Sequence, residues 1–317
     1  MNLTLRTALC GVFACLPYSA FACASCGCTL SGDWESQGFT SQPGVRVDLR
    51  YDYLDQSQLR SGTGRIDRAA IVLPNEREIE QSTKNQYTTV GVDYSPNADW
   101  GINLQLPYVN RSHSTVAPGD VELSSSHTRS LGDVRLIGRY QGLRPQRNVG
   151  LQFGLKLPTG DYRKTFSDGP QTGQLLDRGL QPGSGSTDLL LGAFVVGGLS
   201  EEVDYYAQAM LQTPLASKEN YRPGLSVNLN VGMRYVASEK IVPELQLNVR
   251  TVRRDSGDNA DVENSGGTLA YLSPGVTVAV SQRIKLYGFV QVPIYQRVTG
   301  YQLTPRYTAS LGARYVF

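Results

Sequence analysis

The chain has 317 residues, a net charge of +2 at neutral pH and a mean hydropathy of −0.27. The near-neutral charge gives no reason to expect a nucleic-acid partner. After the N-terminus no stretch approaches the roughly 18 apolar residues of a membrane helix, which excludes a protein anchored by such helices. The 33 glycines and 18 tyrosines, against 3 methionines, favour many β-strands joined by turns.

The first 22 residues have the features of a cleaved signal peptide. Arg6 supplies a positive start, "ALCGVFACL" is an apolar core of about nine residues, and the small residues of "SAFA" precede a cut after Ala22. We therefore expect residues 1–22 to be removed and the exported protein to begin at Cys23. Acylation of Cys23, as in a lipoprotein, is the alternative, but Ala20 and Phe21 fit a lipoprotein signal poorly.

The exported chain would start with three clustered cysteines. Cys23, Cys26 and Cys28 are the only cysteines after residue 22. Three thiols in an oxidising compartment predict one disulfide and one free thiol. A copper(I) or zinc site is the alternative, because clustered thiolates select soft metal ions. We expect residues 23–43 to form a periplasmic segment, where a periplasmic partner would exchange thiols or metal with the cluster. The alternative is that this segment folds into the lumen as a small plug led by Trp34.

From residue 44 onward, apolar and polar residues alternate in many segments. In "GVRVDLRYDY", Val45, Val47 and Leu49 fall on one face, and Arg46 and Asp48 fall on the other. This two-residue period is typical of β-strands. The same alternation predicts about twelve strands, near 44–56, 86–95, 100–113, 130–142, 149–161, 187–199, 204–216, 223–238, 241–255, 268–281, 284–299 and 304–317.

The connections between these segments alternate in length. Those after the second, fourth, sixth, eighth and tenth segments are short, such as "PNAD" and "SEEV", whereas 57–85 and 162–186 are long and polar. One end of the sheet therefore carries tight turns and the other carries loops, as in outer-membrane barrels. A soluble exported β-sandwich is the alternative, but it would not need twelve long strands with such regular turns.

Strands cross a bilayer only as a closed ring, because lipid offers no partners for unpaired backbone groups. We therefore expect an all-β fold: residues 44–317 would form a transmembrane, antiparallel, up-and-down β-barrel of about twelve strands. It would lie in the outer membrane of a Gram-negative bacterium, in contact with lipid. The chain ends on an alternating strand, "YTASLGARYVF", which we expect to close the ring against the first strand. Its last residue, Phe317, is typical of the signal by which the barrel-assembly machinery recognises such strands.

The same alternation predicts which charged side chains line the lumen. Ten basic positions against six acidic ones indicate a wall held by arginine–carboxylate pairs, with a mild preference for anions in a polar pore. The predicted inward basic residues are Arg46, Arg50, Arg135, Arg139, Lys156, Arg234, Arg250, Lys285, Arg306 and Arg314. The predicted inward acidic residues are Asp48, Asp52, Asp93, Asp133, Asp188 and Glu244.

Prolines recur towards the loop-side half of the predicted strands, at Pro107, Pro158, Pro214 and Pro293. Proline removes a hydrogen-bond donor from the sheet and marks edges or bulges. Barrel curvature is the interpretation that we favour. A lateral opening of the wall, through which a hydrophobic solute would pass into lipid, is the alternative.

Two stretches, "FGLKLPTGDYR" (153–163) and "GLQPGSGSTDLLLGAF" (179–194), carry a resemblance to a known family. They resemble the outer-membrane transporter-like proteins associated with meta-pathway phenol degradation. The resemblance implies a channel or transporter for small solutes, including hydrophobic or aromatic ones, and it implies no catalytic residues. A barrel that uses the cysteine cluster for metal binding or redox exchange is the alternative function.

An outer-membrane hydrolase is a further alternative. Such an enzyme needs a serine activated by a histidine on the lipid-facing wall. The candidates are His113 in "RSHST" and His127 in "SSSHTR", but neither has the spacing of the phospholipase signature. We expect both histidines to be ordinary loop residues, and we expect no enzymatic activity.

Overall fold

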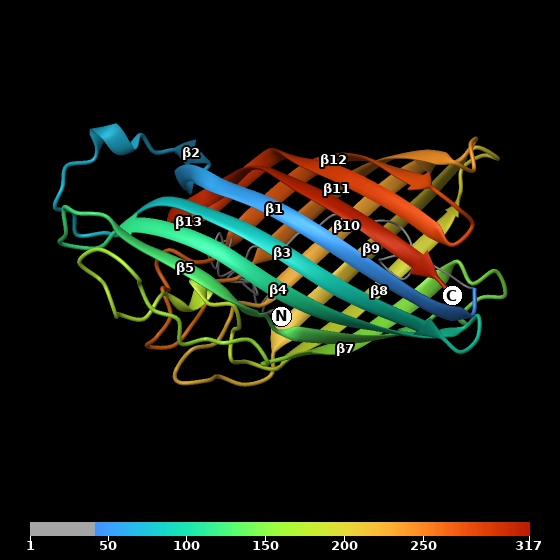
Figure 1. The fold of residues 1–317 in the computed structure, drawn as a ribbon, viewed down its shortest axis with the longest axis horizontal. Helices are drawn as coiled ribbons and strands as arrows, with labels where there is room; N and C mark the ends of the chain where they lie inside the picture. Colours follow the sequence, from blue (N-terminus) through green and yellow to red (C-terminus); the bar gives the residue numbers. More distant parts are fainter. Residues whose placement is uncertain (1–41) are drawn as a thin grey trace, which may run out of the picture.

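The structure is a computed structural model that describes residues 42–317 (Figure 1). It is one antiparallel sheet rolled into a barrel, with two short 3₁₀ turns, η1 (Arg68–Ala70) and η2 (Arg178–Leu180). Within residues 42–317, no helix has the length and apolar character needed to cross a membrane. The strands are β1 (Gly44–Gly62), β2 (Gly64–Arg65), β3 (Ile79–Ser95), β4 (Trp100–Val116), β5 (Ser124–Leu131), β6 (Val134–Tyr140), β7 (Val149–Leu157), β8 (Asp188–Gly198), β9 (Val203–Pro214), β10 (Ser226–Tyr235), β11 (Ile241–Val252), β12 (Gly267–Ala279) and β13 (Ile284–Val316).

The long element β13 supplies two strands of the barrel. Residues 285–298 pair with β12 and residues 302–316 pair with β1, both antiparallel. The two parts form a hairpin in which the Gln296 side chain donates to the carbonyl oxygen of Pro305 over 2.8 Å, and Gly300 adopts a positive φ of 60° at the turn. With β5 and β6 sharing one place in the ring, the barrel has the twelve strands that the alternation predicted.

The last residue belongs to the seam of the ring. The Phe317 N–H donates to the carbonyl oxygen of Val45 over 3.0 Å, and the register continues from Arg46 opposite Val316 along the whole of β1. A closed ring leaves no strand edge exposed to lipid. The expected closure between the first and last strands is therefore confirmed.

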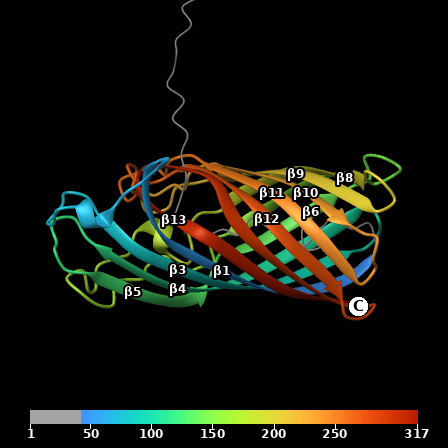
Figure 2. The same ribbon diagram turned by 90° about the horizontal axis from the view of Figure 1, so that it is seen from above.

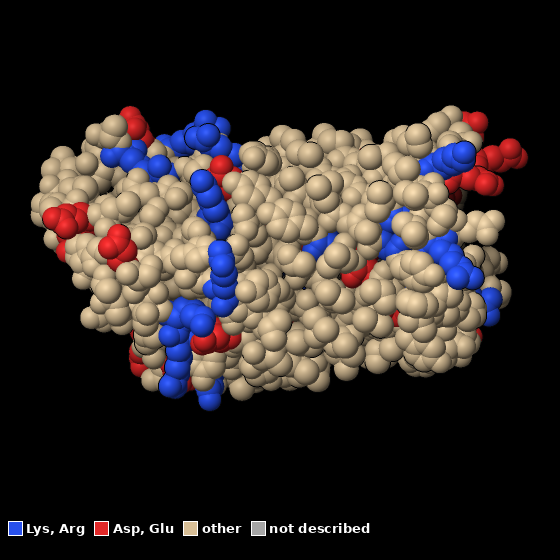
Figure 3. All heavy atoms as spheres, in the orientation of Figure 1, with Lys and Arg blue, Asp and Glu red and all other residues tan. Residues whose placement is uncertain are grey.

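The wall is apolar outside and polar inside. On β11, Leu245 and Leu247 are 49% and 40% exposed, whereas Gln246 and Asn248 are 1% and 0% exposed. This reverses the arrangement of a water-soluble protein. In the face shown in Figure 3, much of the middle of the wall is uncharged, apart from a few charged atoms right of the centre, and most lysine, arginine, aspartate and glutamate side chains lie towards the two ends. Such an outer surface is matched to the hydrocarbon core of a membrane.

Aromatic rings lie near both ends of the wall. At the turn end, the Trp100 and Tyr140 rings are 4.7 Å apart between centroids, and Tyr94 and Tyr235 are also exposed. Towards the loop end, the Tyr53 and Tyr307 rings are 6.3 Å apart. Two aromatic girdles of this kind mark the two membrane–water interfaces of a transmembrane barrel.

Short and long connections lie at opposite ends, as predicted. Figures 1 and 2 show the chain end at Phe317 beside the short turns and the long loops at the far end. The short turns are 96–99, 141–148, 199–202, 236–240 and 280–283, and the long connections include 63–78, 158–187 and 253–266.

Several strands run further into the loop end than expected. β1 continues to Gly62, β3 begins at Ile79, and β5 is a separate strand where a loop was predicted. The sequence of β5, "SSSHTRSL", contains almost no apolar residue. Strand segments beyond the bilayer do not have to present apolar side chains to lipid, so they lack the alternation from which the strands were predicted.

Arg306, one of the predicted inward arginines, is exposed, and so is Arg297, which strict alternation from Lys285 would also place inward. The register between β12 and β13 skips Ile294, and the register between β1 and β13 skips Arg306 itself. Each extra residue of a bulge moves the side chains that follow it to the other face. The inward prediction for these two residues is therefore wrong, because strict alternation does not allow for bulges.

The prolines noted in the sequence analysis lie at bulges, strand ends or changes of strand partner. Pro293 directly precedes the skipped Ile294, and Pro214 ends β9. Pro107 lies where β4 changes its partner from β6 to β5, and its carbonyl oxygen accepts the Gly132 N–H over 2.8 Å. Pro158 directly follows the end of β7. Bulges and strand ends are where a sheet tolerates proline, and the choice between barrel curvature and a lateral opening stays a prediction.

Candidate functional site: a narrowed lumen

The connection between β7 and β8, residues 158–187, folds into the barrel; we call it the inner loop. Leu176 and Leu180 are 3% and 1% exposed and pack with Phe166 in a small apolar cluster. This burial anchors the loop inside the wall instead of leaving it in solvent. The lumen is consequently narrowed by a segment of the chain itself.

Arg111 on β4, which only β6 separates from β7 in the ring, holds the inner loop from the wall. Its guanidinium donates to the carbonyl oxygens of Gly179 over 3.3 Å and Gln181 over 3.5 Å. It also donates to Asn85 over 2.5 Å and to the Tyr87 hydroxyl over 2.8 Å. The carbonyls of a loop have no strand partner, so a buried arginine that satisfies them stabilises the folded-in conformation. Arg111 was missed by the sequence analysis, which followed alternation only in the apolar strands.

Two glycines allow the inner loop to cross itself. A Cβ atom on Gly183 would lie 2.4 Å from the carbonyl oxygen of Gly160, and one on Gly160 would lie 2.7 Å from the Cα of Gly183. The Gly183 N–H also donates to the carbonyl oxygen of Asp161 over 2.9 Å. Only glycine permits such a close backbone approach. The two stretches that carried the family resemblance therefore meet in space, although 22 residues separate the two glycines.

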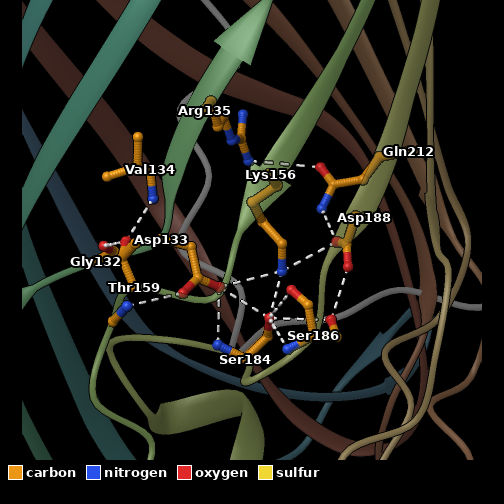
Figure 4. Close-up of polar contacts among 11 residues, drawn as sticks. Gly132, Asp133, Val134, Arg135, Lys156, Thr159, Ser184, Ser186, Asp188 and Gln212 are labelled. Carbon is orange, nitrogen blue, oxygen red and sulfur yellow. Dashed lines mark hydrogen bonds and ion pairs between the residues drawn. The ribbon is translucent and has the colours of Figure 1, made fainter.

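A buried charge cluster joins the inner loop to the wall (Figure 4). The Lys156 Nζ lies 3.1 Å from Asp133 and 3.0 Å from Asp188, and it also donates to the Ser184 hydroxyl. Asp133 accepts the backbone N–H groups of Gly160 over 3.0 Å and Ser184 over 2.9 Å. These contacts connect β7, β8 and the residue that precedes β6 to Gly160 and Ser184, which lie on the two crossing segments of the inner loop. The inward positions of Asp133, Lys156 and Asp188 were predicted, whereas their mutual contact was not.

At the turn end, Asp93 is held between two arginines. Arg46 lies 3.3 Å and Arg139 lies 3.1 Å from its two carboxylate oxygens, and all three side chains are almost fully buried. Arg139 also donates to the Ser95 hydroxyl over 2.8 Å. Two cations on one carboxylate satisfy the charge-assisted bonds that buried ions require.

The first and last strands share a second group of ion pairs. Arg314 lies 3.1 Å from Asp48, which also accepts the Tyr287 hydroxyl over 2.8 Å. Arg50 lies 2.9 Å from Asp52. These contacts lie across or beside the seam of the ring. In this region the lumen wall is held by arginine–carboxylate pairs, as the sequence analysis expected.

The remaining predicted lumen residues have different partners. Arg234 lies 2.8 Å from Asp204 near the turn end. The Glu244 carboxylate accepts the Thr277 hydroxyl over 2.9 Å, Arg250 donates to Asn228 over 2.9 Å, and Arg135 lies 3.5 Å from the Gln212 side-chain oxygen.

A chain of amides lines the half of the lumen formed by β7 to β12. Gln208 donates to Gln152, Asn230 to Gln208 and Asn248 to Asn230 over 2.6, 3.0 and 2.9 Å, and Ser273 donates to Asn248 over 2.6 Å. The sequence analysis considered charged residues only and missed this chain. The alternation of these strands also places their asparagine and glutamine residues on the inward face, and this pattern could have predicted the chain of amides.

Three adjoining cavities follow the lumen from the loop end to the turn end. The central one has a volume of about 200 Å³, against about 40 Å³ on the loop side and about 20 Å³ on the turn side. A cavity needs roughly 10–15 Å³ to hold one water molecule, so both outer cavities are narrow. The central cavity shares Arg178, Tyr221 and Asp255 with the loop-side cavity, and Arg50, Thr89 and Gln105 with the turn-side cavity.

Both candidate histidines lie in strands and not in loops, which corrects the prediction. His113 is buried in β4, with Nδ1 2.8 Å from the Thr83 hydroxyl. His127 is exposed on β5, with Nδ1 2.9 Å from the Ser112 hydroxyl. Within residues 42–317 the Ser112 contact is the one hydrogen bond of the His127 ring.

Cys23, Cys26 and Cys28 lie outside the described residues, as do the predicted signal peptide and nearly all of the predicted periplasmic segment. Among the residues that the structure describes, no group of three histidine, cysteine, aspartate or glutamate side chains is arranged to hold a metal ion. The copper or zinc prediction therefore stays a prediction from sequence.

The closed ring, the apolar outer belt and the polar, loop-narrowed lumen together define an outer-membrane β-barrel. The sequence profile of the family described as the MetA-pathway of phenol degradation matches residues 67–304, which is more than half of the chain. The chain belongs to this family, and the predicted resemblance is confirmed. No match was found among curated proteins.

Among solved structures, the fold is similar to that of an outer membrane channel from Pseudomonas putida F1, with a TM-score of 0.66 at 12% identity, covering 87% of this chain and 96% of that one. Two others are more distant. The CymD monoaromatic hydrocarbon channel has a TM-score of 0.45 at 11% identity, covering 91% of this chain and 94% of that one. A FadL homologue from Pseudomonas aeruginosa has a TM-score of 0.44 at 10% identity, covering 94% and 98%.

Proposed function

We propose that the protein is a channel that carries small solutes across the outer membrane through the barrel lumen. The observation that supports this proposal best is the row of three adjoining cavities, which runs from the loop end to the turn end. A purely structural barrel would gain from a filled interior, whereas here a space of about 200 Å³ stays open at the centre.

The two narrow outer cavities restrict passage through the lumen in the conformation of this structure. About 40 Å³ and about 20 Å³ admit little more than a few water molecules, so passage of anything larger needs side-chain motion at the two constrictions. Arg178 is the side chain best placed to gate the loop side. It lies over the rings of Tyr162 and Tyr221, at 4.6 and 5.2 Å from their centroids, and lines both cavities.

The family relationship supports solutes with aromatic or other hydrophobic character, since its description refers to phenol degradation. The central cavity suits such solutes, because Tyr87, Pro107, Val109, Tyr221 and Val252 are among its lining residues. Ligand sites that combine apolar walls with a few polar groups are typical of small organic molecules. We assign no reaction to the chain.

Swelling of liposomes that contain the purified protein tests the channel. We expect permeation of small solutes that falls steeply with solute size. Arg178→Ala should raise the swelling rate several-fold, because it removes the side chain shared by the central and loop-side cavities. Arg254→Ala is the matched control, since this exposed loop arginine does not line the central cavity. Permeability no higher than that of protein-free liposomes, for both wild type and Arg178→Ala, would contradict the proposal.

The cysteine cluster supports a separate, secondary role in metal binding or thiol exchange at the periplasmic side. The exported full-length protein should then bind copper(I) or zinc in a fixed stoichiometry, and the triple Cys23→Ser, Cys26→Ser, Cys28→Ser variant should lose the metal. Equal metal content in the two proteins would refute this role without affecting the channel.

A further inference from the structure

Arg135 has no carboxylate partner within residues 42–317, and it also lacks the several neutral acceptors that Arg111 has in Asn85, Gly179 and Gln181. Its one hydrogen bond to a described residue is a long one, 3.5 Å to the side-chain oxygen of Gln212. Within residues 42–317 no carboxylate lies within ion-pair distance of it, whereas Arg46, Arg139 and Arg314 each have one at 3.1 to 3.3 Å. A guanidinium has five N–H donors. Most of the binding capacity of Arg135 is therefore unused by the protein.

The neighbouring acids are already occupied and cannot serve Arg135 without breaking other bonds. Asp133 and Asp188 both pair with Lys156, at 3.1 and 3.0 Å. Gln212 donates its amide N–H to Asp188 over 2.5 Å, which turns its oxygen towards Arg135 (Figure 4). The cluster thus orients the guanidinium through one neutral acceptor and leaves its charge unpaired.

Arg135 lines the central cavity, and the charge balance there is positive. Six basic and four acidic side chains line it: Arg50, Arg111, Arg135, Lys156, Arg178 and Arg250 against Asp52, Asp133, Asp188 and Asp255. Inside a barrel wall surrounded by lipid, this excess acts through a low dielectric and favours an anion. The cavity also has apolar walls, and its volume of about 200 Å³ compares with about 150 Å³ for an engineered cavity that binds benzene.

We propose that the central cavity is a binding site for a single-ring aromatic carboxylate, whose carboxylate is held by Arg135 while its ring lies against the apolar walls. The proposal rests on the channel function and names its solute class. The planar guanidinium matches a carboxylate with two parallel hydrogen bonds, which a neutral phenol or hydrocarbon does not provide. The unpaired charge of Arg135 and the size of the cavity are then explained by the same ligand.

Isothermal titration of the detergent-solubilised full-length protein with benzoate tests the site. Wild type should bind benzoate more tightly than benzyl alcohol, which has the same ring without the charge. Arg135→Gln should weaken benzoate binding by about ten- to a hundred-fold, the usual effect of losing hydrogen bonds to a charged group, and leave benzyl alcohol unchanged. Arg135→Lys should recover part of the affinity.

Arg234→Gln is the matched control. It removes the same charge from an inward arginine near the turn end, and this residue does not line the central cavity. Benzoate binding should therefore not change. Equal affinity of Arg135→Gln and wild type for benzoate, in protein that keeps its folded mobility on an unheated gel, would overturn the proposal. So would equal loss of binding in Arg234→Gln, which would indicate a general effect of lumen charge.

Liposome swelling separates this proposal from the channel itself. If wild type passes small neutral solutes but does not bind benzoate, the aromatic-carboxylate site is wrong and the channel stands. If it binds benzoate in an Arg135-dependent way but passes no solute, the site stands as a binding pocket and its role in transport is wrong.

Discussion

At the residue scale, the face of a strand on which a side chain lies decides its environment. Leu49 is 51% exposed towards lipid, whereas Asp52 on the same strand is 0% exposed inside the barrel. Buried charges need partners, and most of the described inward charges have them, as in the contact of Lys156 with Asp133 and Asp188. Residues that depart from this rule, such as Arg135, are the ones with capacity left for a solute.

Gly183 is the residue on which the inner loop depends most directly. In Gly183→Ala the new methyl group would lie 2.4 Å from the Gly160 carbonyl oxygen, so the two backbones must separate. We expect the loop to leave its buried position, at a cost of about 1–3 kcal/mol, and trypsin to cleave at Arg163, Lys164 or Arg178 several-fold faster. Gly198→Ala is the control, because its methyl group would meet its nearest atom at an ordinary 3.4 Å. Identical cleavage of the two variants would contradict the role of the glycine contact.

At the scale of elements, the inner loop and β13 carry the specific features of this barrel. The loop is attached to β4 through Arg111, to β6 and β7 through the Asp133–Lys156 pair, and to the start of β3 through the acids Glu78 and Asp177. β13 turns back on itself and closes the ring. Each attachment leads to a measurable expectation.

The contact between Glu78 and Asp177 should make the inner loop sensitive to pH. Burial, followed by the neighbouring carboxylates of Asp177 and Glu80, raises the pKa of Glu78 well above its ordinary value of 4.5, and burial also raises the pKa of Asp177. The folded loop therefore holds protons that the open loop would release. Its stability is complete at low pH and falls as the pH rises from the ordinary towards the raised pKa values.

Trypsin cleavage of the inner loop should accordingly be slower at pH 5 than at pH 8, after correction for the intrinsic pH dependence of trypsin with an unfolded substrate. Glu78→Gln should flatten this dependence, because the amide donates to Asp177 without titrating. His113, whose Nε2 lies 4.0 Å from Glu78, is the other titratable group that faces it from β4. A dependence equally steep in Glu78→Gln would mean that another group is responsible.

The end of β13 should determine how well the barrel reaches the membrane. Phe317 is 72% exposed, and its ring lies edge-on to Tyr315 at 4.7 Å between centroids. If the assembly machinery binds this aromatic terminus, deletion of Phe317 should lower the amount of folded barrel in the outer membrane several-fold. Heat-modifiable mobility on gels measures that amount. Phe317→Tyr, which keeps a ring at the end of the chain, should assemble normally, and equal levels for the deletion would show that the terminus is not recognised.

At the scale of the whole molecule, the uncharged belt and the two aromatic girdles place the barrel across a bilayer. The long loops lie at one end and the C-terminal Phe317 lies at the other (Figure 1), next to Gly44 at the start of β1. The cavities run between these two ends. Transport, if it follows this row, is a property of the complete ring and of no single strand.

A charge placed on the lipid-facing wall tests this orientation. Leu229 on β10 is 45% exposed in the middle of the strand, so Leu229→Arg should destabilise the barrel in lipid vesicles by about 2–4 kcal/mol. Leu199→Arg changes a residue that is 62% exposed in the short turn between β8 and β9, and it should have little effect. Urea unfolding followed by tryptophan fluorescence measures both. Equal stability of the two variants would contradict the membrane span.

Alternation was enough to predict the strands, the short and long connections, and the inward positions of Asp133, Lys156 and Asp188. These features depend on neighbours two residues apart, and lipid outside with water inside enforces them along every strand. β5 was not predicted because its residues do not alternate between apolar and polar, as strands that face lipid do. The inward prediction for Arg306 was wrong because a bulge depends on the pairing of two strands and not on the sequence of one.

The contacts between distant segments depend on the tertiary structure, because only the closed ring brings these segments together. Three contacts are of this kind: Gly160 with Gly183, Arg111 with the inner loop, and Lys156 with two aspartates. Each joins residues from different segments, so the pattern of a single strand does not predict it. Lumen width depends on the same contacts, because twelve strands alone leave room that the inner loop then fills. The unpaired guanidinium of Arg135 becomes visible only after every neighbouring carboxylate has been assigned its partner.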